Sequence, residues 1–157
     1  MTFLAVFAAV LPMLGSPALA QPACEVTKPN HSRPPAAVVY KAGYAGGALI
    51  HGNGAIWTDL WPEGTVLFKK NGAGFVLPDG SLAMKFLWLI AGDGPLTVTG
   101  KRLDQSAPPL RAEIATGFVG SGFQPSALIF PTEGCWQVTA QANGSELTFV
   151  TRVAKAN

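Results

Sequence analysis

Residues 135–151, CWQVTAQANGSELTFVT, carry the clearest structural signal in this sequence. At their centre lies Asn143-Gly144, a dipeptide preferred in two-residue type I′ turns because both central residues of such a turn adopt positive φ. Folding the chain about this turn creates one apolar face, made of Ala140 opposite Leu147, Val138 opposite Phe149, and Trp136 opposite Thr151. The other face is polar, with Thr139 opposite Thr148 and Gln141 opposite Glu146. A slip of one residue would exchange the two faces, so the pattern predicts a β-hairpin in this register.

Further upstream, apolar and polar residues alternate in several short runs. The longest run is 81–90, whose predicted core face carries Leu82, Met84, Phe86, Trp88 and Ile90. The runs 65–69 and 96–99 alternate in the same way, and Gly, Asn, Asp and Pro clusters separate the runs from residue 37 onward. Alternation with a period of two between turn residues is typical of strands. The sequence therefore predicts an all-β fold, an antiparallel sandwich of two sheets with about eight or nine strands.

The composition narrows the class of protein. The chain has 157 residues, which suits about one domain, and only 13% of them are charged, against a usual value of about 25%. This composition excludes a disordered chain, a coiled coil and a collagen-like protein. The net charge is +2, and basic residues occur as pairs such as Lys69-Lys70 and Lys101-Arg102, so no nucleic acid partner is expected.

The N-terminal segment 1–20 is predicted to be a cleaved signal peptide. It is uncharged and apolar, and it ends in Ala18-Leu19-Ala20, small residues of the kind that precede a cleavage site. The apolar run is shorter than the ~20 residues that span a membrane, and it contains two prolines, so cleavage after Ala20 is favoured over a permanent anchor. Residues 21–36, with Pro22, Pro29, Pro34 and Pro35, form a predicted extended leader, and 37–157 form the sandwich domain.

Export gives the two cysteines, Cys24 and Cys135, two possible roles. In an oxidising compartment an even number of cysteines predicts a disulfide, which here would tie the leader to the final hairpin. Alternatively Cys24, just after the apolar run, would carry a lipid and anchor an envelope lipoprotein, although Gln21-Pro22-Ala23 matches a lipidation box poorly. A membrane association is expected only in that second case.

The stretch 130–139, FPTEGCWQVT, followed by LTFV at 147–150, resembles the closing segment of immunoglobulin-like domains of bacterial surface and secreted proteins. Most of the mature chain is also similar to a group of exported bacterial proteins without an assigned activity, which share turns like those at 61–65, 77–81 and 134–136. The resemblance implies a sandwich fold and no particular activity. One departure is that Cys24 precedes the first strand, so the Cys–Trp–Cys arrangement between immunoglobulin sheets is absent.

Motifs for known catalytic chemistry are missing from the sequence. It contains no phosphate-binding glycine loop, no Gly-x-Ser-x-Gly, no His-Glu-x-x-His and no calcium loop, so no cofactor, metal site or catalytic residue is predicted. One alternative is a small secreted hydrolase in which His51 serves as base for Ser81, Ser121 or an acidic partner.

The stretch 57–64, WTDLWPEG, provides the candidate binding residues Trp57, Asp59, Trp61 and Glu63. Exposed tryptophans beside carboxylates stack on sugar rings or anchor a protein partner. The competing interpretation is that Trp57 and Trp61, four residues apart on a strand, face the same way and close the core. Together these features predict an exported, non-enzymatic binding or structural protein of the cell envelope or extracellular space, whose partner would be an envelope protein or a polysaccharide.

Overall fold

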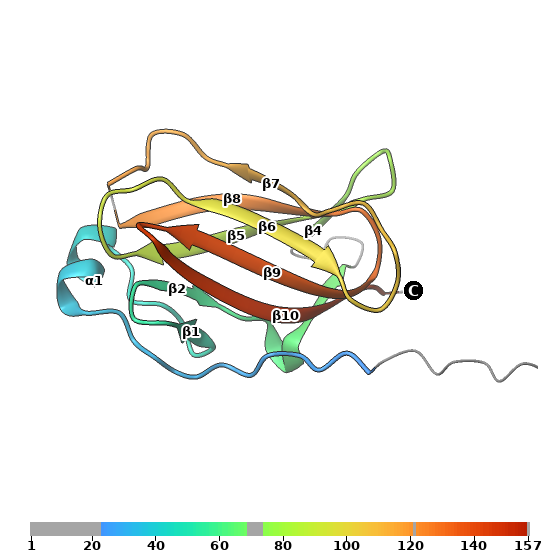
Figure 1. Cartoon of the computed structure of the whole chain (residues 1–157), viewed down its shortest axis with the longest axis horizontal. Coiled ribbons are helices and arrows are strands. Elements are labelled where there is room, and N and C mark those ends of the chain that lie inside the picture. Colours follow the sequence, from blue (N-terminus) through green and yellow to red (C-terminus); the bar gives the residue numbers. More distant parts are fainter. Residues whose placement is uncertain (1–22, 69–73, 121, 157) are drawn as a thin grey trace, which may run out of the picture.

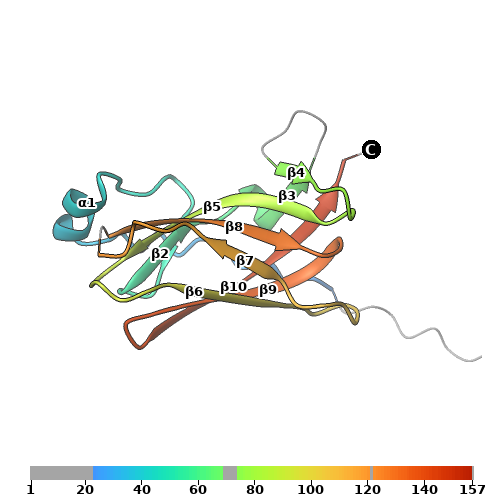
Figure 2. The same cartoon turned by 90° about the horizontal axis from the view of Figure 1, so that it is seen from above.

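Two β-sheets stack face to face in the computed structural model, which describes residues 23–68, 74–120 and 122–156 (Figure 1). The six-stranded sheet has the order β1 (Ile50–Gly52), β2 (Ile56–Asp59), β5 (Leu82–Ile90), β8 (Phe123–Phe130) and β7 (Arg111–Ile114), and β4 (Gly74–Val76) also pairs with β5. The four-stranded sheet has the order β3 (Thr65–Phe68), β10 (Ser145–Lys155), β9 (Gly134–Ala142) and β6 (Thr97–Arg102). Figure 2 shows the two layers edge-on. The predicted β-sandwich is therefore confirmed.

The final hairpin, β9–β10, has the predicted register. Leu147 lies opposite Ala140, Phe149 opposite Val138, Thr151 opposite Trp136, Thr148 opposite Thr139 and Glu146 opposite Gln141. Asn143 and Gly144 adopt φ values of 51° and 76°, as a type I′ turn requires. The Asn143 side chain also donates a hydrogen bond to the Ala91 carbonyl and accepts one from the Gly94 N–H, so it fixes the tip of the hairpin to a neighbouring loop.

The main core lies between the sheets. The predicted inner face of β5 is buried there, with Leu82, Met84, Phe86, Trp88 and Ile90 all in one apolar cluster. From the other sheet, Val66 and Phe68 of β3 and the apolar faces of β9 and β10 complete this cluster. Alternation along single strands therefore located the core correctly.

The structure departs from the predicted all-antiparallel sandwich in the pairing of β3. This strand runs parallel to β10, with Val66 opposite Val153. Parallel neighbours cannot be joined by a hairpin and need a long connection, and here the connection passes through both sheets. The described residues contain ten strands, one or two more than expected, because the short β1 and β4 are strands of three residues each.

A helix, α1 (Ala36–Ala42), occupies a segment where the apolar runs had suggested strands. It follows Pro34-Pro35 and ends at Gly43 in the left-handed conformation, and seven residues are too few to show a helical period. Its Val38 and Ala42 pack with the buried Ile50, Trp57 and Leu89 in a second, smaller apolar cluster. In the described part of the chain, no helix is long and apolar enough to span a membrane. The predicted signal peptide and its cleavage site lie outside the described residues.

Candidate functional site

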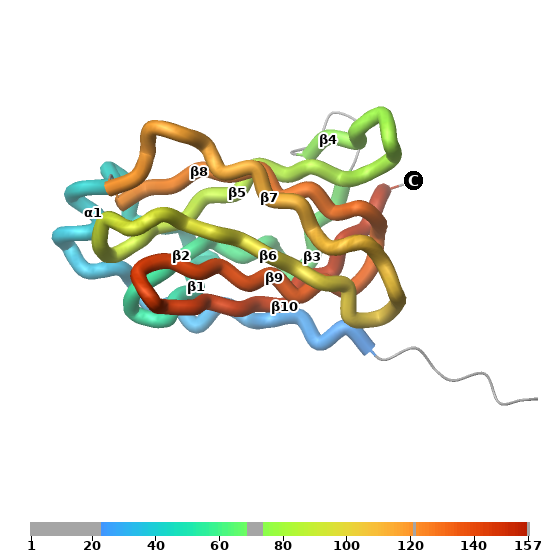
Figure 3. The backbone as a smooth tube through the Cα atoms, turned by 45° about the horizontal axis from the view of Figure 1, so that its top comes forward, coloured from blue at the N-terminus to red at the C-terminus, as the bar shows by residue number. Residues whose placement is uncertain are grey.

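The N-terminal leader is attached to both sheets. Cys24 forms a disulfide with Cys135 at the start of β9. Further along the leader, the Thr27 N–H donates to the Val150 carbonyl at 2.9 Å, and the Val150 N–H donates to the Thr27 hydroxyl at 2.8 Å. Figure 3 shows the leader running beside β10 toward α1. A segment that would otherwise fray at a chain end is thereby held against the sandwich.

The leader then reaches the six-stranded sheet. Asn30 binds Gly52 of β1 with both ends of its amide, donating to the Gly52 carbonyl at 2.7 Å and accepting from the Gly52 N–H at 3.1 Å. The His31 N–H donates to the Ile50 carbonyl at 3.0 Å. These bonds cover the outer edge of β1, which would otherwise expose unpaired backbone groups.

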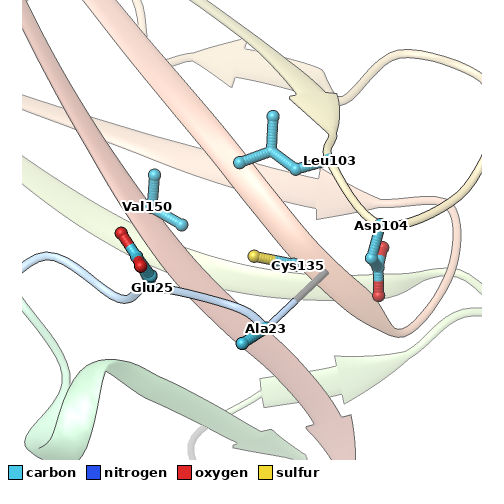
Figure 4. A pocket seen from close by; sticks show the side chains of 6 residues that line it. All are labelled: Ala23, Glu25, Leu103, Asp104, Cys135 and Val150. Atoms are coloured by element: carbon cyan, nitrogen blue, oxygen red, sulfur yellow. The ribbon is translucent and has the colours of Figure 1, made fainter. Parts of the chain in front are cut away.

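A pocket of about 480 Å³ lies over the disulfide (Figure 4). Glu25 and Val150 line one side of Cys135, and Leu103 and Asp104 line the other. The Arg102 guanidinium donates to Asp104 at 2.7 Å and holds the pKa of this carboxyl below its usual range. This carboxylate is therefore committed to an ion pair.

A second depression of about 360 Å³ lies between the leader and the turn that leads into β3, and we call it the leader groove. One wall consists of leader residues 26–29 and 31, and the other contains Leu49, Trp61, Glu63 and Gly64. The short 3₁₀ turn η1 (Pro62–Gly64) forms this second wall. The groove thus exists only because the leader is held beside the sandwich.

The turn and the leader fit closely at Gly64. Gly64 has φ of 63°, and a Cβ at this position would collide with Val26 of the leader. Of the three described non-glycine residues with positive φ, His31 and Glu63 both line the leader groove. Backbone conformations of this kind cost free energy and concentrate at binding sites.

Trp61 and Glu63, two of the four predicted binding residues, meet in the leader groove. Trp61 is half-buried, and its ring packs on Phe86 with centroids 4.7 Å apart and on Phe149 at 6.4 Å. Glu63 is exposed at the rim, as are Lys28 and His31. The groove therefore combines a rigid aromatic wall with a carboxylate, an ammonium and an imidazole.

Trp57 and Asp59, the other two predicted residues, lie elsewhere. Trp57 is 1% exposed and belongs to the cluster under α1, on the opposite side of the sheet from Trp61. The expected common face is lost because β2 ends at Asp59, before Trp61. Asp59 accepts hydrogen bonds from the Tyr44 hydroxyl at 2.6 Å and from the Gly47 N–H at 2.8 Å. The bond from Tyr44 to this carboxylate raises the pKa of Tyr44 to about 12. Asp59 thus anchors the loop after α1.

His51, the candidate base, lies on the edge strand β1 opposite Thr58. Its Nδ1 is buried and has no hydrogen-bond partner in the described part of the chain. Thr58 in turn lies opposite Trp88 of β5, and Trp88 is seven residues from Ser81 along the chain. At roughly 3.3 Å per residue, Ser81 is therefore over 20 Å away from His51. The Ser81 hydroxyl instead donates a hydrogen bond to the Asp79 carboxylate within the same turn.

The other catalytic sets considered from the sequence also gain no support. Ser121 lies outside the described residues. Within residues 23–68, 74–120 and 122–156, no group of three His, Cys, Asp or Glu side chains is placed to hold a metal ion.

Burial of His51 predicts a pH dependence of stability. Desolvation lowers the pKa of His51 below 6.5 in the folded chain, so above pH 6.5 both states are neutral at this site and its full contribution is present. As the pH falls below 6.5 the unfolded state protonates first, and the free energy of unfolding falls by less than the one-proton limit of about 1.4 kcal/mol per pH unit.

The measurement is urea unfolding from neutral pH down to pH 5, above the unfolded pKa of 3.8 through which Asp79 and Asp104 begin to lose their stabilising contributions. The His51→Gln variant should show a flatter profile across this range, and His31→Gln serves as the matched control. An identical slope in wild type and His51→Gln would contradict the assignment.

Sequence reasoning missed the leader side of the groove. Lys28 and His31 stand in a proline-rich segment without apolar periodicity, so no local pattern singles them out. The signal that links them to Trp61 is Cys24, because a disulfide to the last hairpin fixes the path of the leader.

Comparisons with known proteins leave the family open. No protein-family model matches the chain, and no curated protein matches it. Among solved structures, it is similar to the S-layer protein SbsC, domains 4 and 5, with a TM-score of 0.42, 13% sequence identity, and coverage of 67% of this chain and 52% of that chain. The chain thus spans about half the length of that structure.

Proposed function

We propose that this chain is an exported, non-enzymatic β-sandwich protein that binds a polysaccharide of the cell envelope or extracellular space in the leader groove. Export after cleavage at Ala20 and an immunoglobulin-like arrangement of the sandwich belong to the same proposal. The disulfide supports an oxidising compartment, since such bonds persist mainly in exported proteins. A rigid scaffold that presents its binding residues on loops and a tied segment suits recognition.

The observation that carries the proposal is the position of Trp61. One side of its ring is fixed on Phe86 and Phe149, while the residue also forms a wall of the leader groove. A fixed aromatic surface binds a sugar ring with little loss of side-chain entropy. Glu63, Lys28 and His31 at the rim supply acceptors and donors for sugar hydroxyls.

The alternatives are less well supported. A lipoprotein would need the Cys24 sulfur for its thioether, and this sulfur is bonded to Cys135. A hydrolase would need a nucleophile beside His51, and in the described part of the chain Ser81 lies at the far end of the sheet.

Replacing Trp61 with leucine is expected to weaken polysaccharide binding at least tenfold, because the stacking surface is lost while an apolar side chain still fills the space against Phe86. The probes are purified peptidoglycan sacculi in co-sedimentation and soluble neutral polysaccharides in affinity electrophoresis. Glu63→Gln and Lys28→Gln should weaken binding to a smaller extent.

Tyr40→Leu is the matched control, since Tyr40 is a 91% exposed aromatic residue on α1, outside the groove. Thermal unfolding verifies that Trp61→Leu remains folded. Binding that is equal in Trp61→Leu and wild type, or absent from wild type with every probe, would refute a polysaccharide site in the leader groove.

A further inference from the structure

One end of the outer face of the six-stranded sheet is covered by α1. There α1 packs on Trp57 and Leu89. Farther along β5, Leu87 is 40% exposed, and a depression of about 530 Å³ runs over β5, β8 and β7. Its floor and sides include Leu87, Pro125, Ala127 and Ala115, together with the charged Lys85 and Glu113. This face therefore combines a shallow apolar floor with charges of both signs.

Strand register orders these side chains in two rows across the sheet. Lys85 of β5 lies opposite Ala127 of β8, which lies opposite Glu113 of β7. All three point outward, because their neighbours along β5, Met84 and Phe86, belong to the inner core. Two strand spacings put Lys85 and Glu113 roughly 10 Å apart, on either side of a small residue. In the described part of the chain neither has an ion-pair partner.

The second row is Leu87, Pro125 and Ala115. Leu87 lies opposite Pro125, and the Ala115 N–H donates to the Pro125 carbonyl on the other side of β8. A large side chain therefore stands on the β5 side of this row and a small one on the β7 side.

We propose that this outer face binds a second copy of the chain, around a two-fold axis that runs along β8 over Ala127. Rotation by 180° about this axis places β5 of the second copy over β7 of the first, and β7 of the second copy over β5 of the first. Lys85 of each copy then faces Glu113 of the other, and Leu87 faces the small Ala115. Aligned sheets pack about 10 Å apart, a distance that lysine and glutamate side chains can bridge together.

This axis is selected by charge. An axis across the strands would place Lys85 against the second Lys85 and Glu113 against the second Glu113, which is repulsive. The pattern of one cation, one small residue and one anion is self-complementary only for the axis along β8. The proposal does not depend on the leader groove, which lies on a different part of the molecule.

The test is sedimentation velocity of the exported protein with its disulfide intact, at low salt. Wild type should form a dimer. Lys85→Glu and Glu113→Lys should each raise the dimer dissociation constant by roughly tenfold to a hundredfold, because each places two like-charged pairs in the interface.

An equimolar mixture of these two variants should dimerise again, since Lys85→Glu presents only anions and Glu113→Lys presents only cations. The double variant Lys85→Glu/Glu113→Lys should also regain the dimer.

Lys101→Glu, the same charge change on the outer face of β6, is the matched control and should leave the dimer intact. Cross-linking provides an independent test. Because residue 127 lies on the proposed axis, a short thiol cross-linker should join two copies of the Ala127→Cys variant. It should not join two copies of Thr99→Cys, whose cysteine lies on β6 of the other sheet. A monomeric wild type, or a dimer that the single charge reversals do not weaken, would overturn the proposal.

Discussion

The double variant Cys24→Ala/Cys135→Ala is expected to lose as much as about 4–5 kcal/mol of its free energy of unfolding. The disulfide joins residues 111 positions apart in the sequence, so it restricts most of the unfolded chain. For a loop of roughly this length the chain-entropy estimate is about 4.7 kcal/mol. A loss of this size approaches the whole stability of many domains, which is about 5–15 kcal/mol.

Urea unfolding of the double variant and of the reduced, alkylated wild type provides the measurement, and the two should agree. The exposed Glu25 should also become a site of rapid cleavage by a glutamate-specific endoprotease, because the leader keeps only a few hydrogen bonds. The unmodified control should have an intact mass that starts at Gln21, with both cysteines bonded. If the variant unfolds at the wild-type urea concentration and resists the glutamate-specific protease, the disulfide does not hold the leader.

Parts of this fold that depend on neighbouring residues could be predicted from the sequence. Asn143-Gly144 specifies its turn by backbone conformation alone, and the alternating residues on both sides then leave one register that buries the apolar face. The inner face of β5 follows from the same alternation. In both cases the information lies within a few residues of the element it determines.

Features that depend on distant segments could not be predicted. The parallel pairing of β3 with β10 joins residues about 87 positions apart, such as Val66 and Val153, and no local pattern encodes it. The helix α1 has two turns, and its apolar residues suit a short strand equally well. It is stabilised by packing on Trp57 and Leu89 rather than by helix propensity, as is usual for short helices.

The candidate site shows the same division. Trp61 and Glu63 were selected because a tryptophan beside a carboxylate suits binding, and the two residues do line one groove. The prediction that Trp57 shares a face with Trp61 was wrong because the strand ends between them, and alternation holds only within a strand. The opposite wall of the groove comes from the leader, whose position depends on a disulfide to the far end of the chain.

Trp88→Ala is expected to destabilise the fold by about 3–5 kcal/mol, the cost of removing a large buried aromatic side chain. Trp88 is fully buried and packs edge-on against Phe86, with centroids 4.7 Å apart, and against Phe149 of the other sheet at 6.3 Å. Its removal leaves a cavity where the two sheets meet. Chemical unfolding measures the loss, and Leu87→Ala, on the outer face of the same strand, is the matched control with a smaller expected effect.

The polar end of Trp88 allows a finer test of the same site. Its indole N–H donates to the Ser126 hydroxyl at 2.9 Å, in the buried interior. Ser126→Ala should cost about 1–3 kcal/mol because it leaves this N–H without a partner. Trp88→Phe should carry no such penalty for an unpaired polar group, since Ser126 keeps its hydrogen bond to the Phe86 carbonyl at 3.3 Å. The double variant Trp88→Phe/Ser126→Ala should then cost less than the sum of the two, because no donor remains unpaired. Strict additivity would mean that this buried hydrogen bond between β5 and β8 contributes nothing to stability.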